Sequence, residues 1–422
     1  MASFEYLDDR LFVEETSVAD VVAAVGSPCY LYSKRGLAGA YEAFREALGS
    51  GSDLICYAVK ANGNLALLAI LAELGAGFDI VSQGELERVV AAGGDPGRVV
   101  FSGVGKTERE MRRALTLGIR CFNVESVPEL VRLNAVAGSL GVRAPVSLRV
   151  NPDVDARTHP YIATGLKENK FGLPITEAMA LYREGASFPS LRFVGVDCHI
   201  GSQLTELRPF ADALDRILPE VRGLRDSGVV LDHIDMGGGL GIRYRDEQPP
   251  TVQAYVELLR ERLAAHDLEN LSLVLEPGRA LVAASGILVT RIEYLKETAD
   301  KRFAIVDAGM NDLLRPALYE AWQDVIPVKR RSGVGLQYDV VGPVCESADV
   351  LGYERMLTIK TGDLLAVCDA GAYGFAMSSQ YNARPRPPEV LVDGTHFHVV
   401  RDRETYEDLM RGEHIPSLVD DL

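Results

Sequence analysis

Between residues 53 and 277 the chain alternates short apolar runs with longer stretches of helical periodicity. Runs rich in Val, Ile and Phe are typical of buried parallel strands, and helices between them are typical of βαβ units. In NLALLAILAELGAG the pattern predicts a helix with Leu65, Leu68, Ala69 and Ala72 on one face. The eight predicted strands are 53–59, 77–82, 98–101, 119–125, 146–150, 194–200, 233–237 and 273–277.

Eight such units over about 220 residues predict an α/β fold with a closed (β/α)8 barrel rather than an open sheet. After residue 285 the pattern changes, because runs such as RFAIVDAG and EVLVDGTHFHVV alternate with turns and little helical periodicity remains. This predicts a mostly antiparallel C-terminal β domain, to which we expect the first 32 residues to add. The expected boundaries are a barrel at 33–283 and a β domain formed by 1–32 and 284–422.

Polar residues and glycines follow the predicted strands directly. In a barrel, the residues that end the strands share the carboxyl-terminal rim, where barrel enzymes build their active sites. Loops are polar in general, but this does not readily explain a lysine, a histidine and a glycine triplet in the same layer. The residues of this layer are Lys60, Asp79, Ser82, Ser102, Glu125, Asn151, His199, Gly237, Gly238, Gly239 and Glu276.

Composition and charge restrict the classes of partner. The 422 residues carry 44 Lys and Arg against 60 Asp and Glu, a net charge of -16, which argues against nucleic acid or an anionic membrane surface. A few arginines in a pocket could still hold a small anion. The acidic start MASFEYLDDR, the absence of an apolar run of about 18 residues and six scattered cysteines favour a cytoplasmic chain with reduced thiols. No histidine or cysteine spacing predicts a metal site.

Several of these residues together favour one cofactor. Lys60 ends an apolar strand, where loss of hydration should lower its pKa and free the amine to attack a carbonyl. The glycines at 237–239 could cradle a single phosphate. Glu276 could hold a proton on a heteroaromatic nitrogen, and Arg279 could grip a carboxylate or phosphate. With His199 available to stack on a flat ring, these demands are met by pyridoxal phosphate. Taken singly, each has an alternative: a lysine that snorkels to the rim, a tight turn, or a structural ion pair.

The motifs YAVKAN, FDIVSQGEL, HIGSQ, GGGLGI, EPGR, GPVCESAD and GAYG resemble those of the fold-type III pyridoxal-phosphate decarboxylases. The resemblance runs from about residue 30 to about residue 400 with the motifs in the same order. THPYIATGLKENKFG (158–172), RPALY (315–319) and YNARPRPPEVLV (381–392) resemble members that act on diaminopimelate. The resemblance implies decarboxylation of meso-2,6-diaminopimelate to L-lysine and CO2, the last step of lysine biosynthesis. The chain departs from the family pattern at Gln83, where a glycine is expected in many relatives.

The resemblance also implies roles for individual residues. The catalytic group consists of Lys60, which holds the cofactor, His199 on its ring face, and Cys345, a proton donor that comes from the other subunit of a homodimer with shared active sites. The cofactor-binding group comprises Lys60, His199, Ser202, Gly237, Gly238, Gly239, Glu276, Pro277, Gly278, Arg279 and Tyr373. The substrate-binding group comprises Arg279, Arg315 and Tyr319 for the distal carboxylate, Glu346 for the distal ammonium, and Tyr373.

Two other functions stay open at this point. The same fold could decarboxylate ornithine, arginine, carboxynorspermidine or a carrier-bound amino acid, but a substrate without a distal carboxylate would leave Arg279 and Arg315 with nothing to neutralise. A racemase-like barrel or a non-catalytic binder would use the same cofactor. Racemases need a second acid-base residue, commonly a tyrosine, on the opposite ring face, whereas the Cys345 motif favours one-sided protonation.

Overall fold

The computed structural model describes residues 4–154 and 170–416. Most of the 158–172 motif therefore lies outside the described residues. The chain forms two compact units. The first contains Ser33–Gly286 and Gly371–Ala376; the second contains Phe4–Tyr32, Ile287–Ala370 and the chain from Met377 onward.

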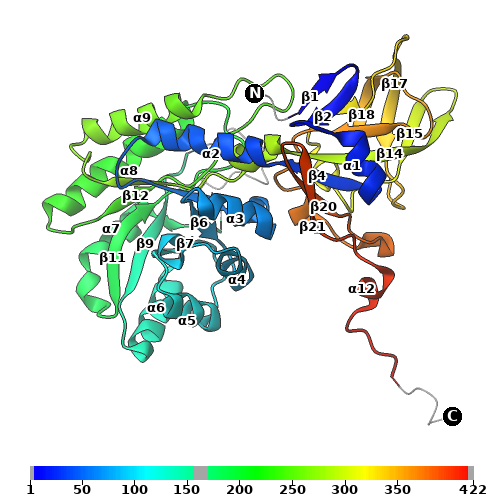
Figure 1. The fold of residues 1–422 in the computed structure, drawn as a ribbon. Helices are drawn as coiled ribbons and strands as arrows, with labels where there is room; N and C mark the ends of the chain where they lie inside the picture. The colour runs from blue at the N-terminus through cyan, green and yellow to red at the C-terminus, as the bar shows by residue number, and fades with distance from the viewer. Residues whose placement is uncertain (1–3, 155–169, 417–422) are drawn as a thin grey trace. The chain divides into compact units, whose positions relative to one another are not determined.

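The first unit is a closed barrel of parallel strands inside a ring of helices (Figure 1). Each strand pairs with the next, and the last pairs with the first, which closes the barrel. The strands are, in this order, β5 (Leu54–Ala58), β6 (Gly77–Ile80), β7 (Val99–Phe101), β8 (Cys121–Val124), β9 (Ala144–Asn151), β11 (Leu191–Asp197), β12 (His233–Asp235) and β13 (Ser272–Leu275). A short β10 (Leu173–Pro174) extends the edge of β9. The predicted barrel and all eight predicted strands are confirmed.

The barrel helices are α2 (Lys34–Leu48), α3 (Leu65–Glu73), α4 (Gln83–Ala91), α5 (Glu108–Leu117), α6 (Val127–Leu140), α7 (Ile175–Arg183), α8 (Arg208–Asp226), α9 (Val252–Ala265) and the one-turn α10 (Arg279–Val282). Six of them begin after a residue whose side chain accepts a backbone N–H of the first turn, which satisfies a donor that the helix leaves unpaired. These caps are Ser33, Asn64, Ser82, Thr107, Ser126 and Thr251.

The buried side of α3 is not the face that carries Leu65. Leu65 is 43% exposed, whereas Leu67, Ile70 and Leu71 are buried together with Leu68. The segment is apolar on nearly every side, so its spacing alone could not select the face that packs on the barrel.

Three polar side chains form a buried chain inside the barrel, from residues in β8, β9 and β12. The Cys121 Sγ lies 3.2 Å from the Ser147 Oγ, which lies 3.0 Å from the His233 Nε2. Cys121 and His233 are the first residues of their strands, away from the carboxyl-terminal rim. Burial lowers the pKa of His233 to about 3, so its ring is neutral at physiological pH.

The second unit is a mostly antiparallel β structure, as predicted. Its main sheet has the order β18-β17-β15-β14-β4-β20-β21, in which β15 and β17 are parallel whereas the pairs β14–β15, β17–β18 and β20–β21 are antiparallel. The strands are β1 (Phe4–Leu7), β2 (Arg10–Val13), β3 (Thr16–Ser17), β4 (Cys29–Ser33), β14 (Gly286–Glu297), β15 (Arg302–Val306), β16 (Val325–Pro327), β17 (Leu336–Val341), β18 (Val350–Leu357), β19 (Leu364–Val367), β20 (Glu389–Asp393) and β21 (His396–Arg401). Short helices α1 (Val18–Val25), α11 (Arg315–Tyr319) and α12 (Tyr406–Met410) complete it.

The N-terminal segment contributes a strand to this sheet, because β4 lies between β14 and β20. Leu11, Val18 and Leu31 share one buried core with Val289 and Val390. Across the described parts of the chain, no helix combines the length and apolar character needed to cross a bilayer.

Candidate active site

Lys60 lies at the rim of the barrel beside a buried carboxylate. It occupies a single 3-10 turn (Val59–Ala61) that follows β5, and Asp79 comes from the neighbouring strand β6. The Lys60 Nζ lies 2.6 Å from the Asp79 Oδ2; the lysine side chain is 36% exposed and the aspartate side chain is fully buried.

The expected fall in the pKa of Lys60 is wrong. Loss of hydration does lower it, but the negative charge of Asp79, and after it that of Glu276, raises it, so the net shift is upward. In this structure the amine is held as a cation by its neighbours, and its reactivity depends on what happens to the Asp79 pair.

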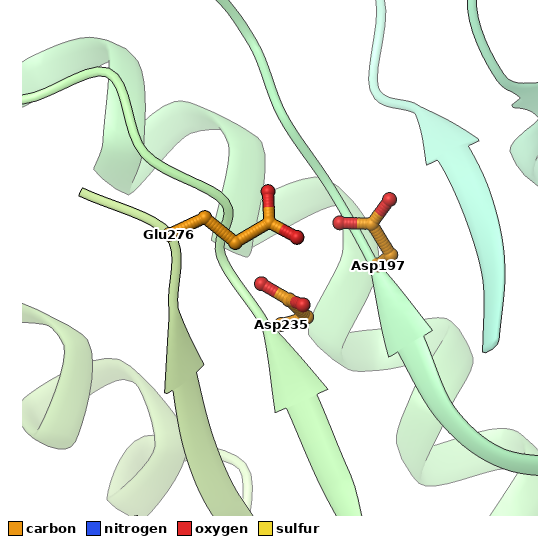
Figure 2. Close-up of side chains that lie close together, drawn as sticks. All are labelled: Asp197, Asp235 and Glu276. Carbon is orange, nitrogen blue, oxygen red and sulfur yellow. The ribbon is translucent and has the colours of Figure 1, made fainter. Parts of the chain in front are cut away.

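Three buried carboxylates meet at the ends of adjacent strands. Figure 2 shows Asp197, Asp235 and Glu276, from the ends of β11, β12 and β13, turned toward one another. One oxygen from each lies within 4.8 Å of the others. Burial raises the pKa of all three, and the repulsion between their charges raises those of Asp197 and Glu276 further. The group therefore favours a bound proton or a cationic N–H over full ionisation.

Neighbouring donors fix the orientation of this carboxylate group. The Asn123 Nδ2 lies 3.2 Å from the Glu276 Oε1, and the backbone N–H of Gly237 donates to the Asp235 Oδ1 over 2.9 Å. The Arg149 Nε lies 3.9 Å from the Asp197 Oδ2. Glu276 is thus held in place before any ligand arrives, as recognition of a ring nitrogen requires.

His199 is held as a neutral ring by the glycine triplet. The Gly238 N–H donates to the His199 Nδ1 over 3.2 Å, which leaves the ring proton on Nε2. Burial and the positive charges of Arg149 and Lys60 lower the pKa of His199 well below its usual value. At Gly237, with φ +61°, a Cβ would lie 2.7 Å from the His199 Nδ1, so only glycine fits there.

Two of the three backbone N–H groups that the sequence offered to a phosphate are bonded within the chain. The N–H groups of Gly237 and Gly238 donate to Asp235 and His199 within the chain. Gly239 has φ +104°, and a Cβ on it would lie 2.6 Å from the Gly201 carbonyl oxygen. In this structure the triplet is a close-packed turn that contacts His199 and Asp235, and its role toward the cofactor stays a prediction.

Arg279, the first residue of α10, presents a clamped guanidinium. Its Nη1 donates to the Tyr244 hydroxyl over 2.7 Å, and its Nη2 donates to the Ser202 Oγ over 3.1 Å. Its Cζ lies 4.9 Å from the centre of the Tyr373 ring. The buried Nε–H has no hydrogen-bond acceptor among the described residues. A buried donor of this kind is costly unless a ligand accepts from it, so this end of the site is suited to an anion.

The segment around Pro277 and Gly278 is packed against the turn that carries Lys60. The Pro277 carbonyl accepts from the backbone N–H of Ala58 over 3.2 Å, and a Cβ on Gly278 would lie 3.0 Å from the Ala61 Cβ. The Tyr373 N–H donates to the Ala61 carbonyl over 2.8 Å. The barrel unit thus brings together all the predicted cofactor residues.

The remaining predicted residues lie in the second unit. Arg315 and Tyr319 begin and end α11, and Arg315 is buried. Cys345 is exposed, and its backbone N–H donates to the Asn382 Oδ1 over 2.9 Å. The Glu346 carboxylate accepts from the Tyr381 hydroxyl.

The loop before β18 that carries Cys345 is fixed by Asp349. The Asp349 carboxylate accepts from the backbone N–H groups of Val344 and Met310, both over 2.6 Å. One buried side chain therefore ties the Cys345 loop to the segment that leads into α11.

Comparison with known proteins identifies the family. The pyridoxal-binding domain model of the pyridoxal-dependent decarboxylases matches residues 35–283. A diaminopimelate decarboxylase of Pseudomonas aeruginosa is 58% identical over 98% of this chain and 99% of its own. One of Vibrio cholerae is 56% identical, with 98% and 99% covered. The chain belongs to the diaminopimelate decarboxylase family.

Solved structures of the family share the fold. The Helicobacter pylori diaminopimelate decarboxylase, complexed with L-lysine, has a TM-score of 0.89 at 42% identity and covers 93% of this chain and 98% of its own. The M. jannaschii enzyme, in co-complex with L-lysine, has a TM-score of 0.94 at 38% identity, with 98% of each chain covered.

The barrel residues fit pyridoxal phosphate, the cofactor of this decarboxylase family. Lys60 would hold its aldehyde carbon, Glu276 would face the pyridine nitrogen, and the uncharged ring of His199 is available to its face. The unpaired Nε–H of Arg279 offers a donor to an anionic group. The barrel unit thus offers a carboxylate partner to a cationic nitrogen and a buried donor to an anionic group.

Several residues that shape the site were not among the predicted site residues: Asp79, Arg149, Asp235, Tyr244 and Asp349. A signal existed for three of them. Asp79 stands in the layer of polar residues that end the predicted strands, and Arg149 and Asp235 are charged residues inside the apolar strands VSLRV and HIDMG, where burial requires a partner. No such signal marks Tyr244, which lies in a loop.

Gln83, the departure from the family pattern, is the first residue of α4. Its Nε2 donates to Glu87 over 3.2 Å and its Oε1 accepts from Arg109 over 3.2 Å. Its side chain thus joins α4 to α5.

Proposed function

We propose that the chain decarboxylates meso-2,6-diaminopimelate to L-lysine and CO2 with pyridoxal phosphate. The relatives named diaminopimelate decarboxylase align over nearly the whole chain, and two of the similar structures hold L-lysine. The observation that carries the proposal is the set of side chains that the barrel unit holds in place: Lys60 paired with Asp79, the carboxylate group of Glu276, and the clamped Arg279 with its unpaired buried Nε–H.

When bound, pyridoxal phosphate supplies a ring that accepts the electron pair left by loss of the carboxylate. Glu276 keeps the ring nitrogen protonated, because the charge of that N–H relieves the repulsion among the three carboxylates. The neutral His199 adds no positive charge beside the ring. Lys60 would hold the cofactor through its Nζ, where the neighbouring Asp79 carboxylate stabilises a bound proton.

Substrate selection is assigned to the two ends of diaminopimelate. Arg279, Arg315 and Tyr319 bind the distal carboxylate, and Glu346 binds the distal ammonium. Cys345 delivers the proton to the α-carbon. The burial of Arg315 supports this role, because a desolvated guanidinium strongly favours a carboxylate partner.

The assembly proposed is a cytoplasmic homodimer in which the β domain contributes to the active site and to the dimer interface. The exposure of Cys345 supports a donor that acts across subunits. Mixing inactive Lys60→Ala and Cys345→Ala proteins should restore part of the activity, because hybrid dimers would contain one intact site. Exchange of differently tagged subunits is the control, and exchange without recovered activity would contradict shared sites.

The proposed reaction is tested by CO2 release from the isomers of diaminopimelate, ornithine, arginine and lysine under identical conditions. The expected result is a strong preference for meso-diaminopimelate and no release by Lys60→Ala. Faster release from ornithine or arginine would overturn the substrate assignment in favour of another decarboxylase of the same fold.

A further inference from the structure

Tyr244 is a buried tyrosine whose hydroxyl is directed at Arg279. It lies in the loop between β12 and α9 and is 7% exposed. Its hydroxyl accepts from the Arg279 Nη1 over 2.7 Å, and its ring centre lies 5.8 Å from the Arg279 Cζ. A charge-assisted bond of this length fixes the rotation of the guanidinium plane as well as stabilising its charge.

The loop that carries Tyr244 is itself rigidly held. The side chain of Gln203 donates to the Ile242 carbonyl over 2.6 Å and accepts from the Ile242 N–H over 3.1 Å. The Glu247 carboxylate accepts from the backbone N–H of Tyr244 over 3.0 Å and from that of Arg245 over 2.7 Å. A loop with these hydrogen bonds, both within itself and to the neighbouring loop, can hold a side chain at a defined place.

The second anchor of Arg279 comes from the neighbouring loop. Ser202, one residue before Gln203, accepts from the Arg279 Nη2 over 3.1 Å. The two terminal nitrogens of the guanidinium are thus held from two loops that are bonded to each other, and the Tyr373 ring lies 4.9 Å from its Cζ. Only the Nε edge of the group has no acceptor among the described residues.

We propose that Tyr244 is a positioning residue that fixes the guanidinium plane of Arg279 and thereby sets the preference for substrates with a distal carboxylate. The inference deepens the proposed function and rests on it. A two-point fork loses much of its preference for a carboxylate when its plane can rotate, since both oxygens must be met in one geometry.

The test compares Tyr244→Phe with the native, cofactor-loaded protein. Tyr255→Phe is the matched control, because Tyr255 is a buried tyrosine whose hydroxyl has no hydrogen-bond partner in the described part of the chain. Tyr244→Phe should raise KM for meso-diaminopimelate roughly tenfold with little change in kcat, as expected for loss of a bond to a charged group. Tyr255→Phe should keep the native constants.

Two inhibitors separate the proposed role from a general loss of structure. L-lysine keeps the carboxylate that is not removed in the reaction, whereas cadaverine has the same chain without it. Tyr244→Phe should raise the inhibition constant of L-lysine by the same factor as KM and leave that of cadaverine and the dissociation constant of pyridoxal phosphate unchanged. In an Arg279→Gln background, Tyr244→Phe should have no further effect, because the group it positions is gone.

Three results would overturn the proposal: an unchanged KM in Tyr244→Phe, an equal weakening of L-lysine and cadaverine, or a loss of pyridoxal phosphate affinity in place of the KM effect. The last would assign Tyr244 to the cofactor. Failure of the proposed function is seen separately, as absence of diaminopimelate turnover by the native protein.

Discussion

The neutral, buried His233 should make the stability of the barrel depend on pH. Its pKa is about 3 in the folded chain, because burial disfavours the imidazolium and the charges of Arg120 and Arg192 repel it. In the unfolded chain the value returns to about 6.5. Below that pH the unfolded chain therefore binds a proton that the folded chain does not. The contribution of His233 is complete above about pH 6.5 and is lost as the pH falls toward 3.

The magnitude follows from the two pKa values. The slope approaches 1.4 kcal/mol per pH unit, and the whole window is worth roughly 5 kcal/mol. Between pH 6.5 and pH 5, a range in which most proteins stay folded, proton uptake by the unfolded histidine lowers the free energy of unfolding by about 1.6 kcal/mol. That is a large part of the stability of an ordinary domain.

The assay is urea unfolding followed by circular dichroism of the barrel helices at both pH values, for the native protein and His233→Gln. A glutamine amide can still reach the Ser147 hydroxyl but does not titrate. The buried carboxylates, whose pKa values are raised, shift stability in the opposite direction in both proteins and cancel in the difference. We expect the variant to lose about 1.6 kcal/mol less than the native protein on acidification.

His398→Gln, an exposed substitution on β21, serves as the control. Its unfolding free energy should change between the two pH values by the same amount as that of the native protein. If the native protein and His233→Gln show the same change in unfolding free energy between the two pH values, the folded ring is taking up a proton, and the reasoning from burial is refuted.

Two further predictions concern the charged groups of the site. Asp79→Asn should lower the pKa of Lys60, because it removes the carboxylate 2.6 Å from the amine. The shift is measured by the pH dependence of Lys60 modification by an amine reagent in cofactor-free protein, and an unshifted profile would contradict it. Arg315→Ala should weaken transition-state stabilisation for diaminopimelate by about 3–5 kcal/mol, because the distal carboxylate would be buried without its partner. This lowers kcat/KM at least a hundredfold. An unchanged kcat/KM would remove Arg315 from the substrate site.

The strands of the barrel could be predicted because each is a short apolar run ended by a polar residue. The orientation of α3 could not, since leucine and isoleucine occupy nearly every side of it. The pKa of Lys60 could not be predicted either, because its partner Asp79 lies on the next strand, in register with Ala58. Knowing that neighbour requires the strand pairing and not only the sequence pattern.

In the site, too, some residues could be predicted from the sequence and their partners could not. Arg279 was predicted from EPGR, but its clamp comes from Tyr244, 35 residues away in sequence, and from Ser202, 77 residues away. Neither spacing has a periodicity that a sequence pattern could reveal. The loops between strands fix these positions through packing and hydrogen bonds, and those became visible only in three dimensions.

The three carboxylates at the ends of β11, β12 and β13 also have a consequence for the life of the protein in the cell. Burial of three like charges lowers the free energy of unfolding of the ligand-free barrel. A ligand that brings a cationic nitrogen to these carboxylates removes the repulsion between them. Thermodynamic linkage then adds roughly 2.7 kcal/mol of stability at a free cofactor concentration a hundredfold above its dissociation constant. Since stability of this size governs how often a chain is exposed to proteases, the amount of enzyme should follow the vitamin B6 supply.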